Sequence, residues 1–566
     1  MLDKSGNLDI TSTGGYATNV EQSIEYICKG EGLETWEPRF TYHGFRYAEV
    51  SGLGSSPTSD LLTGVVIHNS VREVGKFICS DQQINQLHKL ATWTLRSNLH
   101  GVPTDCPTRE KCGWLGDAHV MAPMSIYNYD MQTFWIKYLY DIRSSGRNEV
   151  KAAFANRNKK VPSRRGIKPA GIPFQIAPGR RTSQTASVDW GSAIVQLPWI
   201  VYLYYGNKDI LEEFYPDMLR WVEYCTEYLV KGHIVYEGLG DWGPPDGVKE
   251  CPIELTSTAF HYLNIKLLTE AARTLNRQED CDQYTALMKH VKAAFIEKFY
   301  NKESQSFGGQ TANSVALDFG LVPEGEADKV SMAISEDVNN NHGCFMNTGI
   351  FGLQRIFNAL SMYGNDQVAY QILTKKGSNS FEQMWKEHGA TTLWEILPVK
   401  NFYDGGPERH SRNHPMQGGY DAWFFEGILG IKPDRDSPGF KNVVFRPELT
   451  SQLAWASGTY NSIYGEIKSE WRNENHSFIW NIEIPPNTTG TIYIPQANPS
   501  QIMENGKHIN DLPEIKTSNE QGELVINIPS GIYQFEMINP QAISASHSSK
   551  ASPLPFPPQT LEKARR

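Results

Sequence analysis

The hydrophobic pattern changes its period twice along the chain, and these two changes constrain the fold more than any single motif. From residue 79 to about 430, apolar residues recur at spacings of three and four, after the helix-start signal Ser80-Asp-Gln-Gln. This spacing indicates amphipathic helices. On both sides of this region, β-branched and aromatic residues bounded by Gly and Pro indicate strands. The sequence therefore predicts a multidomain α+β protein with a helical centre.

The helical region, residues 79–430, predicts a ring of helices large enough to form a catalytic domain. Long loops rich in Gly, Pro and Trp separate several of its amphipathic runs, and no repeat of fixed length relates them, which counts against a solenoid. We therefore expect an (α/α)6 barrel and keep a solenoid as the alternative. After the first run at residue 81, the runs lie near 118–143, 187–206, 208–231, 256–275, 279–299, 347–361, 365–376 and 415–430.

The flanking regions predict β structure. Residues 1–78 include Phe40-Thr-Tyr-His-Gly-Phe-Arg-Tyr-Ala-Glu-Val50, which is typical of a strand. Because no obvious first strand precedes it, we interpret this region as a partial N-terminal β domain whose start is missing. Residues 431–540 predict a C-terminal β-sandwich. Its expected strands are 477–484 and 490–494, with 522–528 and 531–537 as a closing pair.

The remaining composition narrows the class of protein. Residues 541–566 are rich in Ser, Pro and Ala and then basic, so they predict a disordered tail. The net charge of −10 makes a nucleic-acid partner unexpected, because phosphate binding needs a basic surface. No apolar run is long enough to predict a membrane span. The 14 Trp mildly favour a carbohydrate ligand, since an indole stacks well on a sugar ring, although most aromatics are core residues.

Cofactors, compartment and assembly are less constrained. The eight cysteines lack zinc-type spacing, so we expect mostly free thiols, no metal site and no cofactor. The N-terminus lacks the features of a signal peptide. Localisation therefore stays open between a secreted or periplasmic protein, if the N-terminus is truncated, and a cytoplasmic one. Oligomeric state is not visible in the sequence.

The segment Asp105-Cys-Pro-Thr-Arg-Glu-Lys-Cys-Gly-Trp-Leu-Gly-Asp117 is the first candidate for chemistry. Pro and Gly prevent it from being a helix interior, and the spacing does not fit a solvated helix face. The alternative to a functional loop is a capping and salt-bridge loop. Burial against Trp114 would raise the pKa of the Glu110 carboxyl, whereas Arg109 would oppose this if it pointed the same way.

A second candidate is Trp385-Lys-Glu-His-Gly-Ala-Thr-Thr-Leu-Trp-Glu395. Taken alone, Glu395 could equally be a first-turn glutamate favoured by a helix dipole. Hydrolysis of a glycosidic bond needs two carboxyl groups in different environments, one to protonate the leaving oxygen and one to activate water or attack. Glu110 and Glu395 are the residues that would form such a pair.

Three further places carry polar and aromatic residues suited to sugars. Asn413 and His414 precede a helix start predicted at Pro415, and the sequence leaves sugar contact and a structural role equally open for them. Asp-Trp pairs occur at Asp189-Trp190 and Asp241-Trp242. Asp accepts hydrogen bonds from hydroxyls and Trp stacks on the ring face, but Asp241 could simply cap a turn and either Trp could be core.

Together these motifs resemble the α-L-rhamnosidases of glycoside hydrolase family 78. The resembling segments occur in the family's order between about residues 36 and 500. They are Phe40-Thr-Tyr-His-Gly-Phe-Arg-Tyr47, Asp105 to Asp117, Asp189-Trp190, Gly240-Asp-Trp242, Gly389-Ala-Thr-Thr-Leu-Trp-Glu395, Asn413-His414 and Gly458-Thr-Tyr to Tyr464-Gly465.

The resemblance implies an inverting exo-glycosidase that acts on terminal α-L-rhamnosides without a cofactor. It implies that Glu110 is the general acid and Glu395 the general base, with their carboxyl groups roughly 6.5–9.5 Å apart. It also implies that Asp105 and Asp117 hold rhamnose hydroxyls, that Trp114, Trp190 and Trp242 form pocket walls, and that His414 contacts sugar or water. The other candidates for substrate binding are Arg109, Asp189, Asp241 and Trp385.

Two departures from the family pattern bear on this assignment. The acid loop is one residue shorter than in many members, which leaves Glu110 as the acid between the flanking aspartates. Glu395 is followed by Ile-Leu-Pro, which affects the expected pocket rim more than the base. The alternatives are a hydrolase of another sugar on the same barrel and a truncated, non-catalytic carbohydrate-binding protein.

Overall fold

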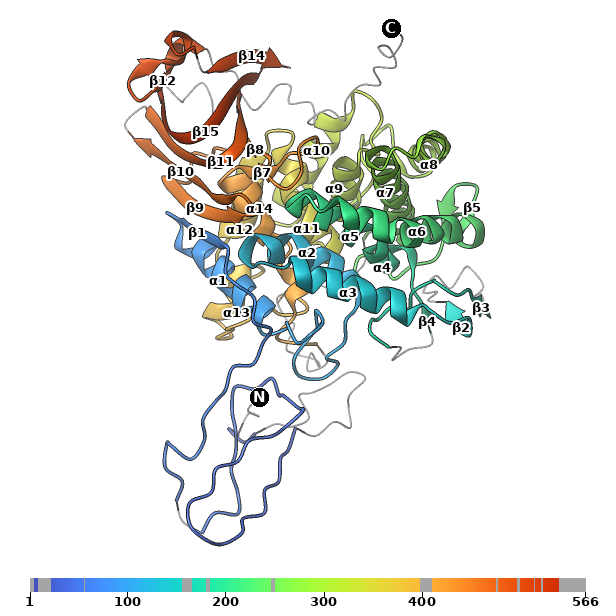
Figure 1. Ribbon diagram of the computed structural model, residues 1–566, viewed down its shortest axis with the longest axis vertical. Helices are drawn as coiled ribbons and strands as arrows, with labels where there is room; N and C mark the ends of the chain where they lie inside the picture. The colour runs from blue at the N-terminus through green and yellow to red at the C-terminus, as the bar shows by residue number, and fades with distance from the viewer. Residues whose placement is uncertain are drawn as a thin grey trace.

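A computed structural model describes residues 5–8, 22–54, 56–154, 165–179, 184–245, 250–397, 410–474, 477–495, 499–513, 515–520 and 523–538. Figure 1 shows an extended N-terminal segment, a helical body and, beside the body, a β unit. The predicted disordered tail at 541–566 lies outside the described residues. No described helix combines the length and hydrophobicity needed to cross a membrane.

Among the described residues, the helical body is a ring in which outer and inner helices alternate. The outer helices are α1 (Gln82–Arg96), α3 (Gln132–Ser145), α6 (Lys208–Tyr224), α8 (Gln278–Phe299), α10 (Ala327–Glu336) and α12 (Asp366–Thr374). The inner elements are α2 (Leu115–Asn128), α5 (Ala193–Tyr205), α7 (Ile253–Thr274), α9 (Gln310–Phe319), α11 (Ile350–Ser361) and the turns η5 (Pro415–Gly418), α14 (Asp421–Trp423) and η6 (Phe424–Ile428).

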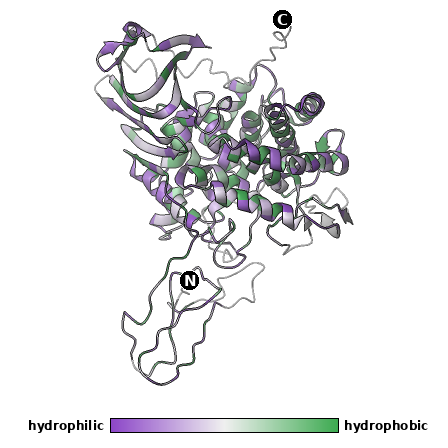
Figure 2. Ribbon diagram, in the orientation of Figure 1, coloured by the Kyte–Doolittle hydropathy of each residue, from purple (hydrophilic) through white to green (hydrophobic). Residues whose placement is uncertain are grey.

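The ring closes because its last inner turns pack on its first helices. The turns η5 and α14 contact both α1 and α2, so the end of the helical region meets its beginning. Inner helices such as α2 and α9 are buried almost all round, whereas α8 buries one narrow face. Figure 2 shows hydrophobic residues concentrated in this helical body. The predicted (α/α)6 barrel is confirmed, and a solenoid, whose ends would not meet, is excluded.

The helix boundaries differ from the predicted runs for physical reasons. The run 118–143 is two helices, α2 and α3, because Tyr129 adopts an extended conformation between them. The sequence missed the ten-residue helices α9 and α10; in α9 the polar residues Gln310, Asn313 and Ser314 are buried, so its polar positions do not mark a solvent face. The run 415–430 is broken into short turns. Gly418 lies against Met124 and Gly427 against Trp423, where a Cβ atom would clash.

The C-terminal unit consists of strands paired mostly with sequence neighbours. They are β7 (Ile431–Pro433), β8 (Asn442–Phe445), β9 (Trp455–Ser462), β10 (Gly465–Glu474), β11 (Ser477–Pro495), β12 (Ile502–Glu504), β13 (Lys507–His508), β14 (Lys516–Glu520) and β15 (Glu523–Ile538), with the short turns η7 (Pro499–Gln501) and η8 (Ile509–Asp511). One half of β11 pairs with β10, and the other half with β8. The ring of Phe445 on β8 meets that of Trp480 on β11 edge to face, and both strands belong to one sheet of the described residues.

The predicted closing pair in this unit was wrong. Residues 522–528 and 531–537 do not pair with each other but are consecutive parts of β15, which runs antiparallel to β11 along its whole length. Likewise, 477–484 and 490–494 are both parts of β11. The register shifts between Ile484 and Thr489, so a β-bulge bends the strands where the sequence suggested that they end.

The N-terminal segment contradicts a predicted strand. Residues 40–50 form no strand, because a strand needs a neighbour to satisfy its backbone groups and no strand pairs with this segment in the described residues. Many of its large apolar side chains are exposed, including Phe40, Phe45 and Val65. The strand β1 (Gly75–Cys79) pairs with β9 and so joins the C-terminal sheet.

The remaining elements are short and lie in connections. They are β2 (Val150–Phe154), β3 (Arg165–Lys168) and β4 (Gln184–Thr185), which form one sheet, the hairpin β5 (Val230–Lys231) and β6 (Ile234–Val235), the helices α4 (Val188–Gly191) and α13 (Phe381–Lys386), and the π turns η3 (Cys225–Leu229) and η4 (Asp337–Asn341).

Candidate active site

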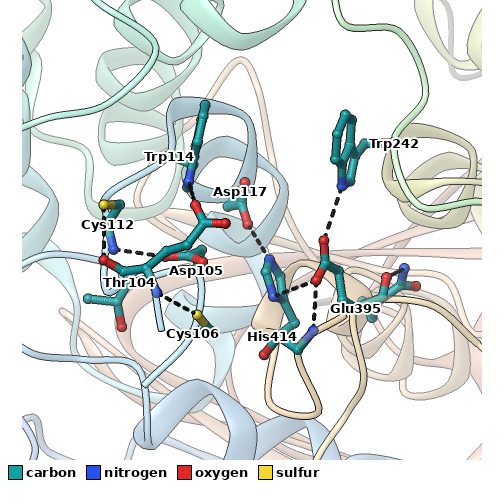
Figure 3. Close-up of polar contacts among 12 residues, drawn as sticks. Thr104, Asp105, Cys106, Cys112, Trp114, Asp117, Trp242, Glu395 and His414 are labelled. Atoms are coloured by element: carbon teal, nitrogen blue, oxygen red, sulfur yellow. Dashed lines mark hydrogen bonds and ion pairs between the residues drawn. The ribbon is translucent and has the colours of Figure 1, made fainter. Parts of the chain in front are cut away.

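The candidate residues gather at one end of the ring. The acid loop, residues 105–114, leads into the inner helix α2, and Trp242 belongs to the loop before α7. Glu395 and His414 lie in the segment before η5. Because inner helices of such a ring run in the same direction, the loops that enter them meet at one face. Figure 3 shows Trp114 and Trp242 on opposite sides of the space above Asp117 and His414.

Glu395 is the best-connected carboxylate of this group. Its Oε2 accepts hydrogen bonds from Nη2 of Arg109 at 2.5 Å and from the backbone N–H of Ser411 at 2.8 Å. Nδ1 of His410 lies 3.7 Å from the same oxygen, and Nδ1 of His414 lies 4.0 Å from it. The Glu395 side chain is only 7% exposed. A buried carboxylate is thus surrounded by cationic and N–H groups.

These neighbours decide the charge of Glu395. Burial by itself raises the pKa of this carboxyl, but His414, His410, Arg109 and the Ser411 amide together hold the pKa well below its usual range. Reciprocally, burial lowers the pKa of His414, but Glu395, Asp117 and Asp105 outweigh it and raise that pKa to about 9. The site therefore holds an ionised Glu395 beside a protonated His414 near neutral pH.

The direction of Arg109, which the sequence left open, is clear in the structure. Its guanidinium pairs with Glu395, 286 residues away in the chain, and is only 6% exposed. Arg109 was predicted to bind substrate; the geometry instead favours a positioning and charge-balancing role. On the other side of His414, Nε2 lies 3.0 Å from Oδ1 of Asp117 in the first turn of α2. His414 thus links Asp117 of the acid loop to Glu395.

Glu110 is held differently. Nε1 of Trp114 donates a hydrogen bond to Oε2 of Glu110 at 2.8 Å, so the indole meets this carboxyl through its N–H. Two thiols hold the backbone of Glu110. The Glu110 N–H donates to Sγ of Cys106, and the Cys112 thiol donates to the Glu110 carbonyl. All eight cysteines are free thiols, as expected. Glu110 is half-buried, so solvent or a leaving group can reach this side of the site.

Asp105 lies at the base of the loop. Its Oδ1 accepts a hydrogen bond from the backbone N–H of Cys112 at 2.8 Å, while its own N–H donates to the Cys112 carbonyl. Burial, with help from the negative charges of Glu110 and Asp117, raises the pKa of Asp105 to about 7. This carboxyl is therefore partly protonated near neutral pH.

Two aspartates predicted to bind substrate are occupied by the fold. Asp241 caps the N-terminus of α11: its oxygens accept hydrogen bonds from the N–H groups of Gly349 and Phe351 and from the Thr311 hydroxyl. Asp189 accepts from the N–H groups of the 238–242 loop, at residues 239 and 240. Both side chains are buried, and their geometry favours a structural role over sugar contact, because their lone pairs face the backbone.

The predicted tryptophans divide in the same way. Nε1 of Trp242 lies 3.4 Å from Oε1 of Glu395, so this indole reaches the site. Trp190 is buried and packs flat against Gly116, where a Cβ atom would lie 2.4 Å from the ring. Trp385, in α13, packs against the hydrophobic core. Its backbone carbonyl accepts a hydrogen bond from the N–H of Gly389. The wall role is thus better supported for Trp114 and Trp242.

Sequence reasoning missed three residues that hold Glu395. Ser411 donates its N–H to the carboxylate and accepts the Glu395 N–H at its carbonyl, and His410 adds a further imidazole. Gln417 donates to the Glu395 carbonyl at 2.7 Å. Residues 410–414, His-Ser-Arg-Asn-His, are all polar, and this density of hydrogen-bonding side chains before Pro415 is the signal that could have found His410 and Ser411.

One other group of described residues has the ligand types for a cation. Ligand atoms of Glu250, Asp337 and His342 lie within 4.8 Å of one another. His342 already lies near both carboxylates as an ion-pair partner, and exposed acidic groups of this kind are common without a bound ion. We assign it no function.

A closed ring of helical hairpins, with the acid loop joined to Glu395 through Arg109 at one end, has the architecture of a six-hairpin glycosidase. The chain matches family models for the bacterial α-L-rhamnosidase six-hairpin glycosidase domain over residues 72–428, the C-terminal domain over 430–509 and the concanavalin-like domain over 1–68. The chain therefore belongs to the bacterial α-L-rhamnosidases of glycoside hydrolase family 78.

Individual relatives agree with this assignment. An α-L-rhamnosidase of Formosa agariphila is 36% identical over 93% of this chain and 55% of its own length. The structure of α-L-rhamnosidase from Dictyoglumus thermophilum is 34% identical, with a TM-score of 0.78 over 89% of this chain and 55% of that one. The Streptomyces avermitilis α-L-rhamnosidase complexed with L-rhamnose is 28% identical, with a TM-score of 0.81 over 95% and 49%. The chain spans about half the length of these relatives.

Proposed function

We propose that this protein is an inverting exo-glycosidase that hydrolyses terminal α-L-rhamnosides, with Glu110 as the general acid and Glu395 as the general base. The observation that carries the proposal is the contrast between the two carboxyl groups. Glu395 is buried and held ionised by cations, whereas Glu110 is half-buried on the opposite loop beside Trp114. One group is suited to accept a proton from water, and the other can give a proton to a leaving group.

The reaction then proceeds in one displacement. Glu110 transfers its proton to the glycosidic oxygen as the bond to the anomeric carbon breaks. Water attacks that carbon from the opposite face and passes its proton to Glu395, so the products are a protonated leaving group and rhamnose of inverted configuration. The carboxyl separation of roughly 6.5–9.5 Å stays a prediction for a substrate complex.

We further propose that Asp105, Asp117 and His414 contact the rhamnose hydroxyls. His414 links Asp117, at 3.0 Å from Nε2, to Glu395, at 4.0 Å from Nδ1, and Figure 3 shows Asp117 and His414 below the space flanked by Trp114 and Trp242. That space has polar groups at its floor and indoles at its sides, the combination that recognises a sugar ring. The bound L-rhamnose reported for the Streptomyces avermitilis relative is consistent with this glycone.

The test is hydrolysis of 4-nitrophenyl α-L-rhamnopyranoside by wild type, Glu110→Gln and Glu395→Gln. We expect wild-type turnover and a fall in kcat of about 10²–10⁴-fold in each variant, the usual contribution of a general acid or base. Normal activity in either variant would remove the role assigned to that residue. Cleavage of another aryl glycoside, without cleavage of the rhamnoside, would favour a different glycone.

The stereochemical part of the proposal has its own test. Proton NMR during the first minutes of hydrolysis should show β-L-rhamnose first, before mutarotation. First release of the α-anomer would instead indicate a retaining mechanism with a covalent intermediate. Binding of rhamnose by a folded sample without any turnover would favour the non-catalytic alternative.

A further inference from the structure

Residues 42–46, named here the strap, connect the N-terminal segment to the acid loop. Nζ of Lys111 donates a hydrogen bond to the Tyr42 carbonyl at 2.5 Å, and the same ammonium lies 4.4 Å from the centroid of the Tyr42 ring. Gly44 approaches the loop so closely that a Cβ atom would lie 2.7 Å from Cγ2 of Thr108 and 2.9 Å from Cγ of Pro107. These residues flank Glu110 on both sides in sequence.

The strap also reaches the segment that carries Glu395. Nη1 of Arg46 donates a hydrogen bond to the Gly389 carbonyl at 3.0 Å. Gly389 has φ +61°, a left-handed conformation that favours glycine, and it begins the Gly-Ala-Thr-Thr-Leu-Trp run that ends at Glu395. Within five consecutive residues, Tyr42 and Gly44 thus contact the loop of Glu110, and Arg46 contacts the segment that leads to Glu395.

The strap itself is anchored on the ring. The Tyr42 ring stacks on the His100 ring with a centroid separation of 3.9 Å. Lys111, directly after Glu110, has φ 54°, which is costly for a residue other than glycine unless tertiary contacts stabilise it. The contacts of its ammonium with Tyr42 supply such stabilisation.

On this side Thr108 and Lys111 of the acid loop border an open pocket. The pocket has a volume of about 490 Å³ and is lined mainly by the N-terminal segment. Its lining includes Trp36, Arg39, His43, Thr108 and Lys111. The position of the loop on this side therefore depends on a few contacts with the strap.

We infer that the strap is a positioning element that holds the two catalytic loops in register, with Lys111 as the residue that fixes the general acid. The inference rests on the proposed function. Proton transfer is sensitive to the placement of the acid, and a misplacement of about 1 Å can cost about 10²-fold in rate. Lys111 acts here through Glu110 and does not itself touch the reacting atoms.

Leaving-group dependence gives the experiment its specificity. A substrate with an activated leaving group, 2,4-dinitrophenyl α-L-rhamnoside, needs little protonation, whereas phenyl α-L-rhamnoside needs a well-placed acid. We expect Lys111→Met to lose at least about 10-fold more kcat on the phenyl substrate than on the dinitrophenyl one. Lys111→Arg, which keeps a donor and a cation over Tyr42, should recover most of the loss.

The other arm of the strap predicts a different signature. Arg46→Met should lower kcat on both substrates alike, because Gly389 precedes the proposed base and activation of water does not depend on the leaving group. Gly44→Ala, which pushes Thr108, serves as a second probe of the acid loop and should show the leaving-group dependence of Lys111→Met.

Lys441 provides a matched control. It donates to the Asn487 carbonyl at 2.5 Å and lies 5.2 Å from the Tyr464 ring centroid, the same pair of contacts in the C-terminal unit. Lys441→Met should leave both rates unchanged, and thermal melting checks that each variant is folded.

The outcomes separate the strap from the proposed function. If wild type is active but Lys111→Met is unchanged, or loses both substrates equally through a higher KM, the strap inference is wrong and the proposed function stands. If wild type hydrolyses neither rhamnoside, both are wrong.

Discussion

The two loops that carry Glu110 and Glu395 have opposite surroundings. Glu395 is buried among Arg109, His410, His414 and the Ser411 amide, and its carboxylate interacts with groups from distant parts of the chain. Glu110 is half-buried and its carboxyl meets the indole of a residue four positions ahead in the same loop. One environment is made by the tertiary fold and the other largely by local sequence.

This difference shows how two glutamates in one site can be suited to different proposed roles, one as general acid and one as general base. Cations that surround a buried carboxylate stabilise its ionised form, so Glu395 stays a proton acceptor at every pH near neutrality. A half-exposed carboxyl on a loop can exchange protons with solvent between turnovers. The contrast can be broken or sharpened by changing one side at a time.

The largest effect is expected for Glu395→Gln. It should lower kcat by about 10²–10⁴-fold on activated and poor leaving groups alike, whereas Glu110→Gln should spare activated ones. The measurement is kcat on the dinitrophenyl and phenyl α-L-rhamnosides. Glu426→Gln is a control for loss of a buried carboxyl, since Glu426 accepts from Tyr204 within the core, away from both loops. Equal leaving-group dependence in Glu110→Gln and Glu395→Gln would contradict the assignment of one residue as acid and the other as base.

A smaller effect, specific to pH, is expected for Arg109→Met. Arg109 lowers the pKa of Glu395, so its removal raises that pKa. Because the base works only when ionised, the acidic limb of the kcat/KM profile should move to higher pH, while His414, His410 and the Ser411 amide still keep Glu395 ionised near neutrality. Arg143→Met, which removes an arginine paired with Asp217 on the outer helices, should leave the limb in place. An unchanged limb in Arg109→Met would contradict the charge-balancing role.

A third effect concerns stability. His414 has its pKa raised from 6.5 to about 9 in the folded state, so it binds a proton more tightly folded than unfolded. Its contribution to the free energy of unfolding is full below pH 6.5 and is lost as pH rises through about 9, by up to roughly 3 kcal/mol. Urea unfolding of wild type between pH 6 and 9.5 should show this decline, and His414→Gln should flatten it. A decline of equal size in the variant would assign the slope to other groups.

The sequence predicted the ring, because amphipathic spacing is a local property. The proposed roles of Glu110 and Glu395 came from the family resemblance and stay predictions. The sequence failed where the structure depends on neighbours. The helix α9 buries polar residues such as Gln310 and Asn313, which a local pattern assigns to a solvent face, and residues 40–50 have strand-like composition without a partner strand. For the same reason the two halves of β15 were predicted as separate strands, because a β-bulge and the end of a strand look alike in sequence.

The site shows the same limit. Arg109, next to Glu110, could have opposed the proposed acid; its pairing with Glu395, 286 residues away, is a tertiary fact that no local pattern contains. Ser411 and His410 were passed over because their role depends on where Glu395 lies. Conversely, the Asp-Trp pattern suggested a sugar contact for Asp241, although its oxygens serve the N-terminus of α11.

The smallest effect tests that last distinction. Asp241→Asn keeps the shape of the side chain but weakens the cap of α11, so it should lower the free energy of unfolding by about 0.5–2 kcal/mol and leave KM nearly unchanged. Asp117→Asn is the matched comparison: Asp117 faces His414 at the proposed sugar floor, so its KM for the aryl rhamnoside should rise. Thermal melting and steady-state kinetics on both variants measure the two effects. A raised KM with unchanged stability in Asp241→Asn would show that Asp241 contacts the substrate. It would also mean that the α11 cap opens when sugar binds.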